Sequence, residues 1–414
     1  MTDFESSLFA SSAAFGEAVS SPAQRAFDSA VELASEIAAS AVERDRDRIF
    51  PHEELAALKA SGLLAALVPT GDGGEGLKLS DHLRIVRLLA QGDPCVAQMF
   101  HGHGLAIYVL NLLAEPTTRV ELNRRVANRS LLWANAVSEL GTANALAMAL
   151  TAGPTAGGWS LNGTKFYCTG SLGADELLVA AMNTDATSDD DAAVLAFVST
   201  DAEGLTINDD WDGMGQRTTA SGTVVFSDVF VSDLRTCTDM TLTKDLASPR
   251  SILAQSGFTS VYLGIAEDAL LEAINYLRDE ARPYPYSGVE RALDDPYILQ
   301  HVGKLRCMLD AAHCLNDRAL DLLDETEDDP TPATRGRAAI AMAQAKAVST
   351  EAVLEVTQRL FQLCGSRSTR QGYGFDRHWR NARTLTLHDP VDYKYRTVGQ
   401  YALDGSYPEI TTYT

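Results

Sequence analysis

Over roughly the first 130 residues, apolar side chains recur every three or four positions, the spacing that gathers them on one face of a helix. Pro22 suits the first turn of the first such helix, because its backbone angle is already helical. The glycine-rich segment 71–76 follows no strand pattern and lacks the ending of a phosphate-binding loop, so we interpret it as a connection. The pattern predicts an N-terminal helical domain, residues 1–130, with helices over 26–46, 52–67, 80–91 and 94–113.

Between about residues 131 and 235 the pattern changes to alternation of apolar and polar positions, which is typical of half-buried strands. Asn162 and Gly163 separate two short alternating runs, 159–161 and 164–167. Asn-Gly between such runs is the strongest local signal for a β-hairpin. We therefore predict a small, barrel-like β-domain, residues 131–235, with further strands over 177–182, 194–198 and 223–231.

Long helical patterns return near residue 245 and are separated by short polar connections such as 326–332. Long helices joined by short links pack antiparallel against their neighbours. The expected fold class is α+β, with the β-domain between two helical domains. The C-terminal domain, residues 236–414, is predicted to be a four-helix bundle with helices over 249–281, 296–325, 333–364 and 377–403.

The composition limits the partners and the compartment. The 414 residues include 56 acidic and 34 basic side chains, a net charge of −22, which repels nucleic acid and anionic membranes. No apolar run reaches the roughly 18–20 residues that cross a bilayer, and the N-terminus has no signal-peptide pattern. The six cysteines show no C-x-x-C spacing, which suits reduced thiols. We expect a cytoplasmic protein with no nucleic-acid or membrane partner.

The densest chemistry lies near the C-terminus. Residues 374–384 hold three arginines, two aromatic side chains, a histidine and an asparagine. His388 then precedes Asp389 and Pro390, where a helix must break, so its ring can face a cavity. A cationic helix in an acidic protein faces an anion, contacts another subunit or pairs with its acidic surroundings, and composition leaves these alternatives open.

His101 and His103 raise the question of a metal site. Two side chains at this spacing on a helix point in different directions, and no third ligand is evident in the sequence. We therefore expect no metal.

Short motifs are spread over the chain at 162–165 (Asn-Gly-Thr-Lys), 168–170 (Cys-Thr-Gly), 209–211 (Asp-Asp-Trp), 215–217 (Gly-Gln-Arg), 221–222 (Ser-Gly), 261–266 (Val-Tyr-Leu-Gly-Ile-Ala), 281–283 (Ala-Arg-Pro), 295–297 (Asp-Pro-Tyr) and 375–390. In this order and spacing they resemble the acyl-CoA dehydrogenase superfamily across essentially the whole chain. The resemblance is nearest to one branch, the two-component flavin monooxygenases typified by dibenzothiophene monooxygenase.

This resemblance implies an enzyme in which reduced FMN reacts with O₂ to form a C4a-hydroperoxide. Such a species decays if water reaches it, so the site must be dry. The chain shows no nicotinamide-binding fold of its own, and the expected source of FMNH₂ is a separate NAD(P)H:flavin reductase. The resemblance also implies a homotetramer.

Two other classes of protein are alternatives. Dehydrogenases of the superfamily use a glutamate base in the segment that corresponds to residues 387–390, where this chain has His388 and Asp389. Asp389 has a shorter side chain one position away, a poor substitute where geometry must hold within about an ångström. An FAD-dependent acyl-CoA dehydrogenase is therefore the disfavoured alternative, and a non-catalytic, scaffold-like homologue is the other.

The resemblance assigns roles to residues that the sequence alone leaves ambiguous. It makes His388 the hydrogen-bond donor and proton carrier, places the Asn135 amide near the flavin, and places Thr169 beside flavin N5. These three are the catalytic candidates, and Trp211 is expected to stack near the flavin ring. Without the resemblance each residue has an ordinary structural explanation. His388 would cap a helix end and Asn135 would lie in a turn, while Thr169 would end a strand and Trp211 would pack in the core.

Arg282 and Arg367 are the expected contacts of the flavin phosphate. Arg282 precedes Pro283, which stiffens the backbone that carries the guanidinium and its paired N–H donors. The simple alternative is that Arg282 is an ordinary surface arginine. Gly365 ends a helix just before Arg367 and allows the backbone to approach a phosphate. The cofactor expected from the family is FMN rather than FAD.

The expected substrate contacts lie on helix 94–113. Gln98 and Gly102 stand where the branch typically has a histidine and a tyrosine, whereas His103 matches a family histidine. Replacing a tyrosine by glycine opens space and removes a hydroxyl. The predicted reaction is oxygenation of sulfur in a small organosulfur compound, from sulfide to sulfoxide or sulfone. N-hydroxylation of an amine or amino sugar is the alternative.

Overall fold

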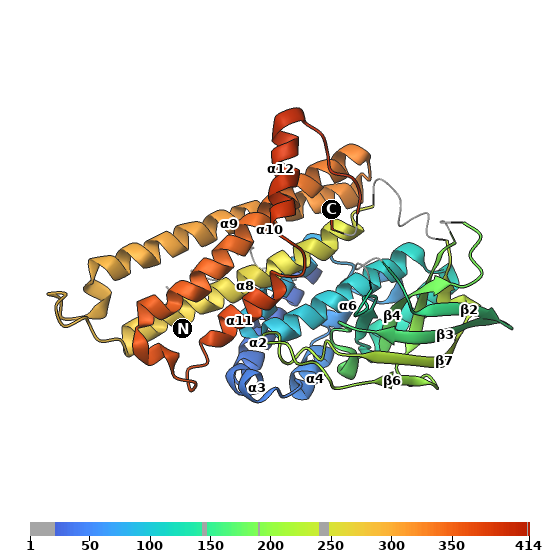
Figure 1. The fold of residues 1–414 in the computed structure, drawn as a ribbon, viewed down its shortest axis with the longest axis horizontal. Coiled ribbons are helices and arrows are strands. Elements are labelled where there is room, and N and C mark those ends of the chain that lie inside the picture. The colour runs from blue at the N-terminus through green and yellow to red at the C-terminus, as the bar shows by residue number, and fades with distance from the viewer. Residues whose placement is uncertain (1–20, 143–146, 189–190, 240–247, 412) are drawn as a thin grey trace.

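The computed structural model describes residues 21–142, 147–188, 191–239, 248–411 and 413–414. Residues 1–20, on which the expected absence of a signal peptide rests, lie outside this part. Figure 1 shows long helices of the C-terminal half side by side, with the β-sheet at one end of the molecule and the N-terminal helices beneath. The predicted α+β fold class, with a sheet between two helical parts, is confirmed.

The N-terminal helices are α2 (Pro22–Ala38), α3 (Ala41–Asp47), α4 (His52–Ala60), α5 (Leu79–Gly92), α6 (Pro94–Leu113) and α7 (Pro116–Arg129), with 3-10 turns η1 (Leu63–Ala65) and η2 (Thr70–Asp72). The prediction of one helix over 26–46 is wrong, because the chain breaks at Ser40, whose hydroxyl donates to Glu54 Oε1 (3.0 Å). Helix α7 was missed, although Pro116 begins it and the Glu115 carboxylate caps it by accepting from the Thr117 N–H (2.9 Å).

The central strands are β1 (Trp133–Ala136), β2 (Thr151–Thr155), β3 (Gly158–Lys165), β4 (Glu176–Asn183), β5 (Ala193–Ser199), β6 (Leu205–Ile207), β7 (Val224–Ser232) and β8 (Thr236–Cys237). Short turns η3 (Ser171–Gly173) and η4 (Asp233–Arg235) interrupt them. The strands form one sheet in the order β6-β7-β3-β2-β4-β5-β8, and β1 pairs in parallel with β4. The described strands therefore follow an open path that curls into a half-barrel.

The predicted hairpin turn at Asn162 and Gly163 is wrong. Strand β3 runs through both residues, and the β2–β3 turn lies at Ala156 and Gly157 instead. The register against β7 shifts between Leu161 and Gly163, which marks a β-bulge. Gly163 has φ +136°, so the Asn-Gly pair supplies the bulge rather than a turn.

The C-terminal helices are α8 (Arg250–Asp279), α9 (Pro296–Asp328), α10 (Pro332–Cys364), α11 (Asp376–Leu385) and α12 (Asp392–Asp404), with 3-10 turns η6 (Ala292–Asp294) and η7 (Ser366–Thr369). A proline opens both α9 and α10, and Thr331 caps α10 through a capping box. The prediction of one helix over 377–403 is wrong: Asp389 and Pro390 fall in a break between α11 and α12, which stand at a steep angle to each other in Figure 1.

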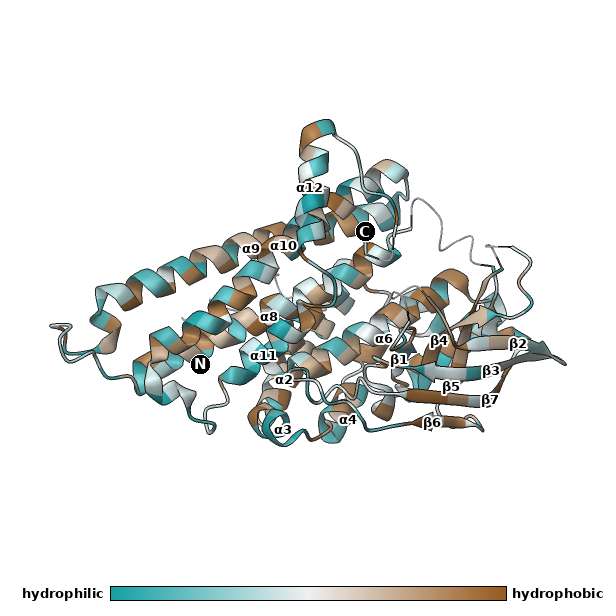
Figure 2. Ribbon diagram, viewed as in Figure 1, coloured by the Kyte–Doolittle hydropathy of each residue, from teal (hydrophilic) through white to brown (hydrophobic). Residues whose placement is uncertain are grey.

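Apolar side chains concentrate where the three parts meet. Figure 2 shows brown segments on α6, α8 and the inner strands, and teal ones along the outer faces of α9, α10 and α12. Helix α6 is buried over most of its length and contacts α5, α8 and β1. No described helix is long and apolar enough to span a membrane. The core therefore makes α6 a rigid support shared by the sheet and the bundle.

Candidate functional site

Helix α6 is the element around which most of the expected site residues lie. Its start is fixed by Asp93, whose Oδ1 accepts from the Cys95 N–H (2.8 Å) and whose Oδ2 pairs with Arg44 (2.7 Å). Both side chains of this pair are buried. A capped, buried helix start fixes the positions of the residues that follow, including Gln98 and Gly102.

Asn135 approaches α6 from strand β1. Its Nδ2 donates to the Gly102 carbonyl oxygen (2.8 Å). A Cβ on Gly102 would lie 3.3 Å from that nitrogen, so glycine leaves room for the amide. The structure thus brings together the predicted catalytic Asn135 and the predicted substrate contact Gly102.

Thr169 approaches α6 from the sheet side, after β3. Its Oγ1 lies 2.8 Å from Ser221 Oγ, which lies 2.7 Å from Thr219 Oγ1, and Thr219 donates to the Gln216 carbonyl oxygen (2.9 Å). The next residue, Gly170, lies against the Met99 side chain of α6. A chain of hydroxyls therefore orients Thr169 beside the same helix that holds Asn135.

Trp211 stands at the edge of this hydroxyl chain. Its Nε1 donates to the Gln216 carbonyl oxygen (2.8 Å), the same oxygen that Thr219 uses. Its ring contacts Tyr167 edge-on, with centroids 6.0 Å apart. The tryptophan is thus fixed by the loop that follows it, in an aromatic group near Thr169.

His388 reaches the site from the bundle. Its ring lies over Phe258 of α8, with centroids 4.1 Å apart and planes 32° from parallel. On another side, Phe258 contacts His101 of α6 edge-on, with centroids 6.0 Å apart. His388 is about two-fifths exposed, and it lines a cavity of about 690 Å³ between α12 and residues 406–409, 411, 413 and 414. Cavities of this size hold small molecules.

The other two predicted substrate contacts differ in their surroundings. The Oε1 atom of Gln98 is buried without a protein partner. His103 is fully engaged: one ring nitrogen, Nε2, donates to the Leu64 carbonyl oxygen (2.8 Å), and the other, Nδ1, accepts from the Trp133 N–H (3.1 Å). His103 therefore ties α6 to η1 and β1 through both nitrogens, a structural duty that its sequence position did not reveal.

The pair His101 and His103 points in two directions, as its spacing predicts. His101 Nε2 donates to the Ala254 carbonyl oxygen (3.2 Å), whereas His103 bonds toward Leu64. Burial lowers the pKa of both rings to about 4. Both are therefore neutral near pH 7.

Arg282 and Arg367 lie far from His388 within one protomer. Arg282 follows α8, whose Phe258 contacts His388 near the opposite end, and 21 residues of helix between Phe258 and Asp279 span about 31 Å. Arg367 lies in η7 after Gly365, at the same distant end, and both arginines are exposed. The protomer therefore does not bring the predicted phosphate contacts to its own His388.

Sequence reasoning missed a buried charged group behind His388. Asp389 binds Lys346 of α10 through Oδ1 and Lys394 of α12 through Oδ2 (3.0 Å). All three side chains are at least nine-tenths buried. The sequence offered one indication of this group, because Lys346 is the single charged residue within the alanine-rich run 338–347.

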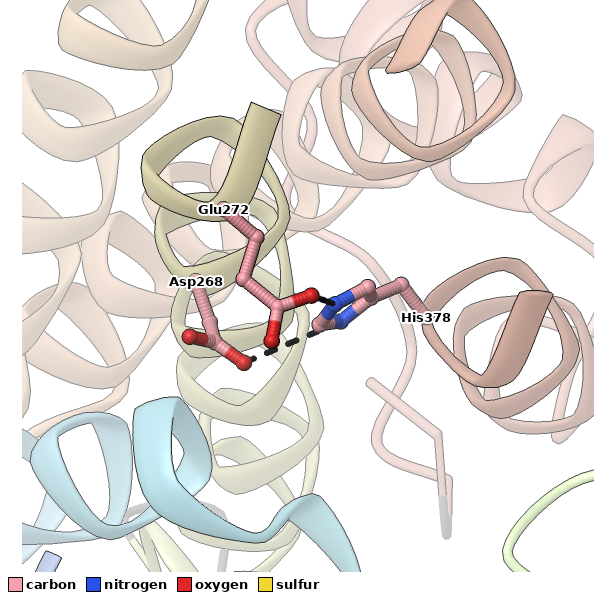
Figure 3. Close-up of side chains that lie close together, drawn as sticks. All are labelled: Asp268, Glu272 and His378. Carbon is pink, nitrogen blue, oxygen red and sulfur yellow. Dashed lines mark hydrogen bonds and ion pairs between the residues drawn. The ribbon is translucent and has the colours of Figure 1, made fainter. Parts of the chain in front are cut away.

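A second ionisable group joins α11 to α8 (Figure 3). His378 Nε2 lies 2.8 Å from Glu272 Oε2, and Arg377 bonds both oxygens of the same carboxylate (3.1 and 2.6 Å), with Asp268 beside them. Asp268, Glu272 and His378 place ligand-type atoms within 4.8 Å of one another. Because the guanidinium of Arg377 already occupies the carboxylates, this group acts as an ion-pair clamp for the arginine-rich segment.

Three acyl-CoA dehydrogenase domain families match the chain: the N-terminal domain over residues 21–129, the middle domain over 134–229 and the C-terminal domain over 256–393. The chain belongs to the acyl-CoA dehydrogenase family. Within the family it is 38% identical to dibenzothiophene monooxygenase of Mycolicibacterium goodii over 91% of this chain and 93% of that protein. It is also 33% identical to a probable FMNH₂-dependent monooxygenase of Pseudomonas putida over 96% and 99% of the two chains.

Among solved structures of the family, FMN-bound TdsC from Paenibacillus sp. A11-2 is similar, with a TM-score of 0.90 and 36% identity over 94% of this chain and all of that one. These relatives confirm the predicted resemblance to the flavin monooxygenase branch.

Proposed function

We propose that this chain is a reduced-flavin-dependent monooxygenase that uses FMNH₂ and O₂ to oxygenate sulfur in a small organosulfur compound. The relatives named above are a dibenzothiophene monooxygenase and a probable FMNH₂-dependent monooxygenase, and this chain aligns with nearly their whole length. The observation that carries the proposal is the placement of Asn135 and of the Thr169–Gly170 segment beside α6. His388 of the α11–α12 link stacks on Phe258, whose ring in turn contacts His101 of α6. An amide and a hydroxyl thus lie beside α6, and one phenylalanine ring separates the imidazole of His388 from that helix.

The same site argues against dehydrogenation. A dehydrogenase needs a free carboxylate to remove a proton from its substrate. Asp389 is buried and binds two lysine ammonium groups. Burial raises the pKa of Asp389, but the hydrogen bond from His388 and the two lysines outweigh it and hold that pKa below its usual value. A carboxylate so bound is a weak base in a fixed position.

The residues present fit a flavin. Buried polar atoms without protein partners lie on the elements around the site: Gln98 Oε1 on α6, and both side-chain amide atoms of Gln216 beside the Trp211 loop. Buried polar atoms normally have a hydrogen-bond partner, and the polar edge of a bound flavin ring would supply one here. Asn135, Thr169 and Trp211 would hold the ring system, and bound reduced FMN would supply the oxygen-activating chemistry. Arg282 and Arg367, the latter being two residues after Gly365, would hold the phosphate of a flavin bound by another copy of the chain.

The protein's own part is to orient the bound ring and to manage one proton. Asn135, whose Nδ2 donates to the Gly102 carbonyl oxygen, would hold the edge of the bound ring with its amide group. Thr169, oriented by Ser221, can donate its hydroxyl hydrogen. His388 can deliver or accept a proton at the ring nitrogen that does not face Asp389.

Several features extend this proposal. FMNH₂ would come from a separate NAD(P)H:flavin reductase, the assembly would be a homotetramer, and the compartment would be the cytoplasm. The domains would span 1–130, 131–235 and 236–414. The substrate would reach His388 through the cavity beside α12. Gln98 and Gly102 of α6 would contact it, and the buried ring of His103, with both nitrogens bonded to the protein, would hold that helix in place.

Stopped-flow absorbance tests the proposal. Anaerobic protein with FMNH₂ is mixed with O₂, first alone and then with sulfides or amines. We expect a persistent band distinct from both reduced and oxidised FMN, and faster decay with product formation when a sulfide is added. His388→Phe should retain FMN binding and lose product formation, whereas His301→Phe on α9 should behave as wild type. Reoxidation at the rate of free FMNH₂ would refute the proposal, and product from amines alone would favour N-hydroxylation.

A further inference from the structure

The buried lysine–aspartate cluster behind His388, formed by Lys346, Asp389 and Lys394, joins elements that are far apart in sequence. Asp389 lies in the α11–α12 link, Lys346 in the middle of α10 and Lys394 in the first turn of α12. Lys346 also binds Gln255 of α8, and Lys394 donates to the Tyr413 carbonyl oxygen. The cluster thus fixes the link that carries His388 from three sides.

Its charges do not balance. Two ammonium groups face one carboxylate, and the side chains of Lys346 and Lys394 are each only 2% exposed. Burying charges is costly, and apolar residues of similar volume commonly stabilise such a position as well or better. A surplus positive charge in the core is therefore poorly explained by stability alone.

The cluster touches His388 directly. His388 Nδ1 lies 3.4 Å from Asp389 Oδ1, the oxygen that also binds Lys346. Catalytic hydrogen bonds are often this long before ligand binds. Lys346 Nζ lies 5.5 Å from the centroid of Phe258, the ring on which His388 stacks. The ammonium and the imidazole therefore share one aromatic neighbour and one carboxylate oxygen.

We propose that Lys346, Asp389 and Lys394 are positioning residues that hold His388 as a neutral ring, with its Nδ1–H toward Asp389 and Nε2 free for proton transfer. Two opposing influences act on the imidazole. The carboxylate stabilises the charged ring, and the two ammonium groups destabilise it. Their sum sets the pH at which the ring accepts a second proton.

The direction of each influence follows from the geometry. Burial lowers the pKa of His388, the bond to Asp389 raises it, and the two lysines lower it further. Burial also lowers the pKa of Lys346, to about 8, against the pull of Asp389, so this ammonium is charged at neutral pH and below. The other titratable or charged groups around the ring are His101 from α6, Tyr262 from α8, Tyr393 and Arg396 from α12, and Glu409 and Tyr413 from the last segment.

The test measures the protonation of His388 in the flavin-free protein. Diethyl pyrocarbonate modifies the neutral imidazole, and trypsin releases residues 384–394 as a peptide with one histidine, His388. Mass spectrometry of that peptide after brief labelling at a series of pH values gives the labelling midpoint. Lys346→Met should move the midpoint to higher pH, because a repelling charge is gone. Asp389→Asn should move it to lower pH, because the attracting charge is gone.

Matched variants separate this role from a general loss of structure. Lys346→Arg keeps the charge and should keep the midpoint near that of wild type, and Lys304→Met, exposed on α9, should leave it unchanged. Asp389→Asn leaves two buried lysines unpaired and can fail to fold. The double variant of Lys346→Met with Asp389→Asn removes one charge of each sign and should return the midpoint toward wild type. Shifts in one direction for both single variants, or no shift, would overturn the proposal.

The role of His388 in oxygenation rests on the proposed function, whereas the labelling midpoint does not. If the protein is an oxygenase, the pH profile of product formed per FMNH₂ consumed should move with the midpoint in each variant. If Lys346→Met and Asp389→Asn moved the labelling midpoint in opposite directions but the protein had no oxygenase activity, the role of the cluster would stand and the proposed function would be refuted. Normal activity with an unmoved midpoint would keep the function and refute the role.

Discussion

At the scale of single residues, the buried histidines of the N-terminal layer are fixed in one protonation state. A proton added to His103 Nδ1 would displace the Trp133 N–H that this nitrogen accepts. His101 is buried against Phe258, and burial holds the pKa of both rings at about 4. Burial likewise lowers the pKa of His82, which packs on Phe100. These rings hold α6 in place only while they remain neutral.

We therefore expect the free energy of unfolding to fall as the pH drops from about 6.5 toward 4. In that window the unfolded chain binds a proton on each histidine and the folded chain does not, so acid favours unfolding. Each of His101 and His103 should contribute roughly 2 kcal/mol of this loss between pH 7 and pH 5. Urea titrations at the two pH values measure it. His103→Phe should weaken the pH dependence and His301→Asn should not, and equal dependence in both would contradict the assignment.

Arg367 gives a second prediction at this scale. A charged hydrogen bond to a phosphate is worth about 1.5–3 kcal/mol, so Arg367→Ala should weaken FMN binding by that amount. Arg370, three residues further and also exposed, offers a matched control. Quenching of FMN fluorescence gives both affinities. Equal effects of the two substitutions would make Arg367 one surface cation among several.

At the scale of elements, strand β3 depends on a glycine where the sequence pattern suggested a turn. A Cβ on Gly163 would lie 2.8 Å from Leu150 Cα, a contact with backbone that cannot move aside, and φ there is +136°. The bulge at Gly163 lets β3 continue along β7 up to Lys165. The strand end in turn leads directly to Thr169.

Gly163→Ala should consequently destabilise the fold by about 2–4 kcal/mol, because it combines overpacking with backbone strain. Gly157→Ala, in the true β2–β3 turn, meets open space and should cost only about 1 kcal/mol for its positive φ. Gly303→Ala, within α9 and also in open space, should stabilise by about 0.5–1 kcal/mol. Thermal unfolding of the three variants ranks their stabilities. If Gly163→Ala were as stable as wild type, the strand would not depend on a glycine at the bulge.

These elements mark what a sequence can and cannot predict. The long helices and the strands β4, β5 and β7 follow local periodicity, and the structure has them within a few residues. Asn-Gly failed as a turn signal because a bulge uses the same backbone freedom. The sequence shows a helix-breaking Asp389–Pro390 pair, but the angle between α11 and α12 depends on tertiary packing that the sequence pattern does not contain. Lys346 meets Asp389 across 43 residues of chain, a pairing that no local pattern contains.

At the scale of the whole molecule, the expected flavin contacts fall into two groups. Asn135 and Thr169 lie beside α6, and His388 stacks on Phe258 of α8. Arg282 and Arg367 lie at the far end of α8, about 31 Å of helix from Phe258. FMN is too short to span that distance. We therefore predict that, in the proposed homotetramer, the exposed arginines of one copy of the chain would complete the flavin site of another copy.

A complementation experiment decides whether the site is shared. One chain carries Arg282→Ala with Arg367→Ala, the other carries His388→Phe, and each alone should be inactive. Co-expressed at equal levels, they should recover about one quarter of wild-type activity, because each site draws its histidine and its arginines independently from two kinds of chain. His388→Phe paired with Asn135→Ala is the matched control, since both residues lie around one α6, and it should recover nothing. If both pairs were inactive, the arginines would serve the site of their own protomer, and if the arginine variant were active alone, they would bind no flavin.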